Sequence, residues 1–279
     1  MVDIKKEQER DELHRAIWAI ADELRGAVDG WDFKNYVLGT MFYRYISENL
    51  TNYINSGEQD AGDTDFDYAK ISDAGAEEAR EGLVEEKGFF IPPSELFCNV
   101  NLKADNDENL NETLESVFKH IEPSAKGSSS ESSFAGLFDD FDVNSNKLGS
   151  TVAKRNERLT KLLHGVADMN LGDVKDHDID AFGDAYEYLM TMYASGAGKS
   201  GGEFFTPADV SELLTRLGTV GKTGINKVYD PACGSGSLLL KAEKVLGKDA
   251  VRNGFYGQEI NITTYNLCRI NMFLHDVGF

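Results

Sequence analysis

The sequence is poor in cysteine, proline and positive charge, and it has no long apolar run. Its 279 residues include three cysteines and five prolines. Three cysteines are too few for a disulfide framework, which predicts a protein of a reducing compartment, the cytoplasm. No run approaches the roughly 18 apolar residues of a membrane-spanning helix, and residues 1–10 hold no apolar signal core. We therefore expect neither membrane insertion nor export.

Positive charge is scarce and unevenly distributed. The chain has 28 Lys and Arg against 48 Asp and Glu, a net charge of −20. Residues 58–150 hold 22 acids and 7 bases (net −15), whereas residues 151–279 hold 16 acids and 14 bases (net −2). Because binding to DNA phosphates needs local cations, this balance at first argues against a nucleic-acid partner. The acidic stretch is either a solvated surface, or a face turned away from DNA or mimicking its charge.

The first 165 residues predict helices and loops without a convincing series of strands. Apolar residues recur at helical spacing in residues 6–25, 33–50, 108–121 and 151–164, and residues 77–87 can also be helical. Residues 56–67 are polar and acidic and predict a loop. Residues 123–133 are rich in serine and predict a flexible connection. We expect a helical domain over residues 1–165.

The pattern changes near residue 178, where helices begin to alternate with short strands. Thr206 and Pro207 are typical of a helix start, as a cap and a first-turn proline. The other predicted elements are a helix at 178–195, a strand at 225–229, a helix at 238–246, a strand at 255–257 and a helix at 261–275. Residues 166–279 therefore predict the first part of a Rossmann-like α/β sheet, following the helical N-terminal domain.

The strongest chemical signal lies in the turn after the first predicted strand. Gly234 and Gly236 allow the backbone to approach a ligand at the carboxyl end of that strand. Asp230 can accept hydrogen bonds from an ammonium group of the ligand. Glu259 follows the second strand, where an acid can accept hydrogen bonds from both hydroxyls of a ribose. The alternative is a simple glycine turn beside a solvated Glu259.

Other ligand motifs are incomplete. A dinucleotide fingerprint needs a third glycine where Leu239 stands. Gly198-Lys199-Ser200 resembles the end of a phosphate-binding loop, but Tyr193 replaces the glycine that such a loop needs. The five histidines show no metal-ligand spacing. We therefore predict neither a nucleoside triphosphate site nor a metal site.

Several motifs resemble those of adenine-N6 DNA methyltransferases. Residues 230–236 (Asp-Pro-Ala-Cys-Gly-Ser-Gly) resemble motif I, which binds S-adenosylmethionine, and residues 202–207 (Gly-Glu-Phe-Phe-Thr-Pro) resemble motif X. The order of motif X, motif I and the acid of motif II is that of the gamma group. Further stretches resemble the modification (M) subunits of type I restriction–modification systems, nearest the IC subgroup: residues 33–47, 88–97, 142–149, 183–189, 257–261 and 266–274.

The resemblance implies a cofactor and a set of residues that bind it. The cofactor would be S-adenosylmethionine, and residues 166–279 would begin a methyltransferase domain. The implied binding residues are Glu203, Phe204, Phe205, Thr206, Pro207, Ala208, Asp230, Gly234, Ser235, Gly236, Ser237 and Glu259. Residues 203–208 would line the methionine end of the cofactor, and Asp230 would meet its amino group. Residues 234–237 would pass beneath it, and Glu259 would bind the ribose.

The catalytic motif of the resembled family is missing. That motif is Asn-Pro-Pro followed by an aromatic residue, and it binds the flipped adenine. The only Pro-Pro pair is Pro92-Pro93, which follows Ile91 and lies far upstream of motif I. We assign no catalytic residue and expect the sequence to stop before this motif. The 279-residue chain alone is expected to be inactive.

The resemblance also implies partners. The full subunit would methylate adenine N6 in double-stranded DNA within a complex. That complex would contain a specificity (S) subunit, a second M subunit and a restriction (R) subunit, and it would involve no membrane. Two alternatives stay open: a non-catalytic assembly module with a residual cofactor pocket, and a methyltransferase acting on protein or RNA.

Overall fold

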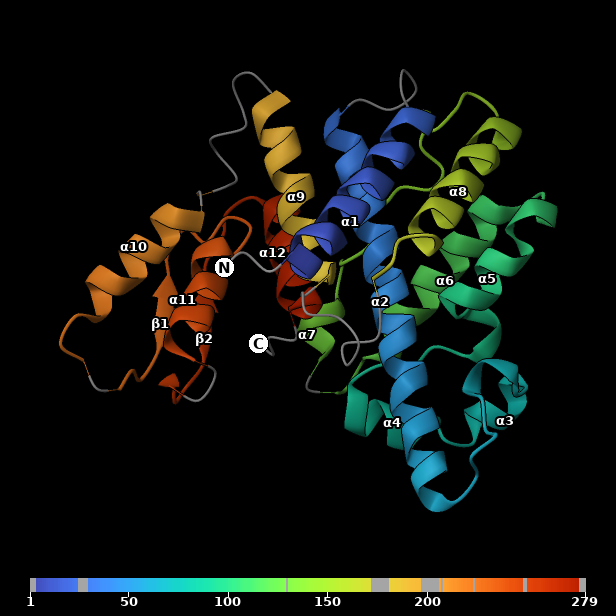
Figure 1. Cartoon of the computed structure of the whole chain (residues 1–279). Helices are drawn as coiled ribbons and strands as arrows, with labels where there is room; N and C mark the ends of the chain where they lie inside the picture. Colours follow the sequence, from blue (N-terminus) through green and yellow to red (C-terminus); the bar gives the residue numbers. More distant parts are fainter. Residues whose placement is uncertain are drawn as a thin grey trace. The chain divides into compact units, whose positions relative to one another are not determined.

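The chain folds into two compact units, residues 1–179 and 180–279 (Figure 1). The computed structural model describes residues 4–24, 30–128, 130–171, 181–196, 206, 208–222, 224–247 and 250–275. Within these residues, no helix is both long enough and apolar enough to cross a membrane. The domain boundary predicted after residue 165 stays a prediction.

The described residues of the first unit form helices joined by turns and loops, with no strand among them. Its α-helices are α1 (Ile4–Glu23), α2 (Gly30–Ala61), α3 (Asp73–Glu77), α4 (Arg80–Lys87), α5 (Phe97–Lys103), α6 (Leu110–Ser124), α7 (Glu131–Phe134) and α8 (Val152–Ala167). Three short 3-10 helices complete it: η1 (Tyr68–Lys70), η2 (Pro93–Glu95) and η3 (Ala104–Asn106). The short helices α3, α5 and α7 were not predicted from the sequence.

Helix α2 forms the centre of the first unit. It packs against α5, α8 and η1, and apolar residues surround most of its circumference. Met41 and Phe42 have no exposed surface. The ring of Phe118 on α6 stacks on that of Phe138, with centroids 4.3 Å apart. Such offset aromatic packing adds to the free energy gained from burying apolar surface.

Two segments predicted as loops are more ordered than expected. Helix α2 continues to Ala61, so residues 56–61 are helical. The serine-rich connection is held by hydrogen bonds: the Ser124 hydroxyl accepts from the Phe90 amide at 2.9 Å, and the Ser128 hydroxyl donates to the Gly88 carbonyl at 3.1 Å. These partners are distant in sequence, so local composition cannot reveal the contacts; the flexibility of the connection stays a prediction.

The second unit contains α9 (Ala181–Gly196), α10 (Ala208–Thr219), β1 (Val228–Asp230), α11 (Ser237–Leu246), β2 (Phe255–Gly257) and α12 (Ile262–Leu274). The two strands pair in parallel, with Tyr229 opposite Tyr256. Helix α11 packs on both strands, α10 packs on α11, and α9 packs on α12 (Figure 1). The predicted fold class, a helical domain followed by the start of a parallel sheet, is confirmed.

Candidate cofactor site

The loop after β1 forms a tight turn at the carboxyl end of the strand. Gly234 and Gly236 have φ angles of +55° and +83°, in the left-handed region that favours glycine. The Gly236 amide donates to the Cys233 carbonyl at 2.8 Å, and the Cys233 amide donates to the Gln258 carbonyl at 2.9 Å. The turn is therefore fixed both internally and to the segment that follows β2.

Two carboxylates flank this turn. Asp230 is the last residue of β1, and its side chain accepts a hydrogen bond from the Ala232 amide at 3.0 Å. Glu259 follows β2 and accepts from the Gly234 amide at 3.1 Å and from the Asn261 amide at 2.9 Å. Each carboxylate oxygen has more than one lone pair, so Glu259 can accept further hydrogen bonds. The structure thus brings the predicted acid of β2 against the glycine loop of β1.

Helix α12 supports the loop through contacts that the sequence analysis did not assign. Asn271 donates to the Ser235 carbonyl at 2.8 Å. A Cβ on Gly236 would lie 2.3 Å from the Met272 methyl carbon and 2.8 Å from the Cys268 sulfur. A side chain at position 236 is therefore disfavoured by the left-handed backbone and would require Met272 and Cys268 to shift. The resemblance of residues 266–274 to modification subunits is the sequence signal for this segment, and it assigns no role to Asn271.

The second strand also approaches the loop closely. A Cβ on Gly257 would lie 2.8 Å from the sulfur of Cys233. The sulfur atoms of Cys233 and Cys268 are 3.9 Å apart in the core of the unit. The contact between the two thiols lowers the pKa of Cys233, and the same contact together with burial raises the pKa of Cys268. Cys233 thus serves as a small buried residue of the turn.

The structure describes only part of the predicted site. It brings together Asp230, residues 234–237 and Glu259. Thr206 is exposed, and α10 begins at Ala208. Glu203, Phe204, Phe205 and Pro207 lie outside the described residues.

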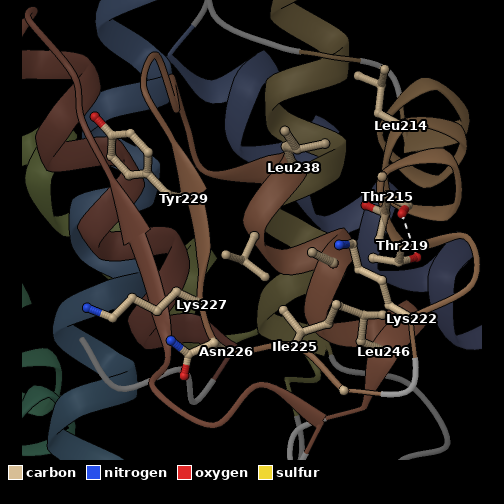
Figure 2. Close-up of a pocket in the computed structure, with 14 residues that line it drawn as sticks. Leu214, Thr215, Thr219, Lys222, Ile225, Asn226, Lys227, Tyr229, Leu238 and Leu246 are labelled. Atoms are coloured by element: carbon tan, nitrogen blue, oxygen red, sulfur yellow. Dashed lines mark hydrogen bonds between the residues drawn. The ribbon is translucent and has the colours of Figure 1, made fainter.

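A separate pocket of about 700 Å³ lies between α10, β1 and α11 (Figure 2). Its lining includes Leu214 and Thr215 of α10, Tyr229 of β1, and Leu238 and Leu246 of α11. None of the predicted cofactor residues lines it. It is a groove beside β1 with both polar and apolar lining residues, distinct from the loop that carries the two acids.

The fold defines a class: a helical domain followed by the start of a parallel α/β sheet. Comparison with known proteins makes this specific. Residues 13–166 match the HsdM N-terminal domain family, and residues 177–279 match the N-6 DNA Methylase family. The chain belongs to the family of type I restriction–modification methylase (HsdM) subunits.

Individual relatives agree with this assignment. The chain is 50% identical to the type I restriction enzyme MpnII methylase subunit of Mycoplasma pneumoniae, over 99% of this chain and 52% of that protein. The MjaIX methylase subunit of Methanocaldococcus jannaschii is 22% identical, over 94% of this chain and 45% of that protein.

A solved structure shares the fold. The crystal structure of the type I restriction–modification methyltransferase subunit from Streptococcus thermophilus superposes with a TM-score of 0.77 at 30% identity, covering 97% of this chain and 57% of that one. The chain thus spans about half the length of the relatives it matches.

Proposed function

We propose that the second unit binds S-adenosylmethionine at the loop after β1. The observation that carries this proposal is the position of Glu259, whose carboxylate joins the Gly234 amide to the start of α12. Acids at the ends of adjacent parallel strands, with a glycine turn between them, match the chemistry of a cofactor with one ammonium group and one ribose. The two carboxylate acceptors therefore fit the cofactor.

Each described residue then has a role in binding. Asp230 accepts hydrogen bonds from the amino group of the methionine portion. The backbone of residues 234–237 passes beneath the cofactor, and Glu259 accepts from the ribose hydroxyls. Residues 203–208 are proposed to complete the methionine end, with backbone amides at the start of α10 facing the carboxylate. When bound, S-adenosylmethionine supplies an electrophilic methyl group on its sulfonium.

For the whole subunit, we propose transfer of that methyl group to adenine N6 in double-stranded DNA. A specificity subunit, a second modification subunit and a restriction subunit are the proposed partners. The acidic residues 58–150 belong to the first unit and are proposed to lie off the DNA path, with cations for the phosphates supplied by the rest of the complex. The sequence contains no Asn-Pro-Pro motif, so the chain alone is expected to methylate no adenine.

Titration calorimetry with S-adenosylmethionine on the 279-residue chain tests the site. Glu259→Gln keeps the shape of the side chain but replaces one acceptor oxygen with a donor. We expect affinity to fall by about tenfold or more, because hydrogen bonds to charged groups contribute about 1.5–3 kcal/mol. Glu212→Gln on α10, where Glu212 pairs with Arg216 on the surface, is the matched control and should bind as wild type does. Equal affinities for all three proteins would refute the ribose assignment.

A further inference from the structure

The side chain of Asn271 lies beneath the glycine loop and is almost completely buried, with 1% of its surface exposed. Its Nδ2 donates to the Ser235 carbonyl at 2.8 Å, whereas its Oδ1 has no hydrogen-bond partner among the described residues. Burying an amide group is unfavourable unless it is hydrogen-bonded. The hydrogen bond from Asn271 to the Ser235 carbonyl offsets the cost of burying this amide, and it is made to the glycine loop.

That contact fixes one peptide plane. The carbonyl of the Ser235–Gly236 peptide accepts from Asn271, and its amide donates to the Cys233 carbonyl at 2.8 Å. The peptide is therefore held at both ends. It directly precedes α11, whose N-terminus at Gly236 has no side-chain cap. The orientation of this peptide thus determines where the uncapped amides of the first turn point.

We propose that Asn271 is a positioning residue for the cofactor loop. It orients the Ser235–Gly236 peptide so that the turn and the start of α11 are formed before the cofactor binds. Without this donor, the Ser235 carbonyl is buried without this partner, and the peptide is held only through the Gly236 amide. The cofactor part of this inference rests on the proposed function, but the effect on the loop does not.

The same helix offers a matched control. Asn266 is also an asparagine of α12 and is 2% exposed, and its Oδ1 accepts from the Arg269 guanidinium. Replacing either asparagine with leucine removes a buried amide from the same helix. If Asn271 has a purely structural role, the two substitutions should affect the loop similarly. If Asn271 positions the loop, only Asn271→Leu should affect it.

Hydrogen exchange on the full chain separates these outcomes. We expect Asn271→Leu to speed exchange of amides 234–237 by about tenfold relative to wild type, and Asn266→Leu to leave these amides unchanged. Affinity for S-adenosylmethionine should fall by a similar factor in Asn271→Leu alone. Unchanged loop exchange in Asn271→Leu, or equal acceleration in both variants, would overturn the proposal. If wild type binds no cofactor, the proposed function fails while the exchange result still decides the role of Asn271.

Asn271→Asp provides a second test in a variant of nearly the same shape. A protonated carboxyl can donate an O–H to the Ser235 carbonyl, whereas an ionised one cannot. After correction for intrinsic exchange rates, protection of amides 234–237 should return toward the wild-type value as pH falls, with no such recovery in Asn271→Leu. Protection in Asn271→Asp that is independent of pH would contradict the role of the donor.

Discussion

The two units differ in how they use apolar residues. Among the described residues, four large apolar side chains are exposed in the first unit: Trp18, Tyr53, Leu102 and Val152. Ten are exposed in the smaller second unit: Val210, Leu213, Leu214, Leu217, Val220, Tyr229, Tyr256, Ile260, Ile262 and Tyr265. The first unit therefore encloses its own core, whereas the second leaves much of its apolar surface uncovered.

The uncovered surface of the second unit has a regular arrangement. Val210, Leu213, Leu214 and Leu217 share one face of α10, and each is at least 44% exposed. Tyr229 and Tyr256 pair across β1 and β2 and are 56% and 46% exposed. Parallel sheets are normally covered on both faces. One buried cluster of this unit (Cys233, Leu239, Leu240, Cys268 and Met272) includes residues that pack against the glycine loop.

The largest effect is expected from deleting a core side chain of the first unit. Leu114 on α6 is 1% exposed, and Leu114→Ala should lower the free energy of unfolding by about 2–5 kcal/mol because it leaves a cavity. Leu217→Ala on α10, where the side chain is 63% exposed, should change it by about 0.5 kcal/mol or less. Urea unfolding of both variants measures the difference. Similar losses would mean that α10 is as well packed as α6.

This contrast also marks the limit of prediction from sequence. Helical periodicity predicted α1, α6 and α8, because their apolar faces recur at regular intervals. The glycine spacing and the acids at 230 and 259 predicted the loop and its flanking carboxylates. The support from Asn271 and Met272 was not predictable in that way. It depends on a hydrogen bond between Asn271 and Ser235, which are 36 residues apart in the sequence.

A glycine substitution tests whether the loop is the tightly packed part of the second unit. Gly236→Ala should destabilise that unit by about 2–4 kcal/mol, since it combines a left-handed backbone with overlap against Met272 and Cys268. Gly254→Ala is the matched control: its φ is +80°, but a Cβ there would meet no atom within 4 Å. We expect it to cost only the backbone penalty, about 1 kcal/mol. Thermal unfolding measures the loss of stability, and hydrogen exchange in each unit shows where the loss occurs. Equal losses of stability in Gly236→Ala and Gly254→Ala would show that packing beneath the loop contributes nothing.

The smallest expected effect is a pH dependence confined to the first unit. Lys34 on α2 is 1% exposed; burial lowers its pKa to about 8, and the nearby Asp140 partly opposes this shift. Above about pH 8 the folded state loses this proton while the unfolded state, with an ordinary lysine pKa, keeps it. Stability therefore rises with pH in this range, by about 1 kcal/mol between pH 7 and 9 from this group.

Lys34→Met removes the titrating group and keeps a long apolar side chain. The variant should be more stable than wild type at pH 7, and the difference should narrow as pH rises through 8 toward 10. Urea unfolding at several pH values, with hydrogen exchange reporting on each unit, measures this. A difference that stays constant with pH would show that Lys34 keeps an ordinary pKa. If the pH dependence of stability were located in the second unit, a group other than Lys34 would be responsible. The expected contrast between the enclosed core around α2 and the open surface of α10 and the two strands would then be lost.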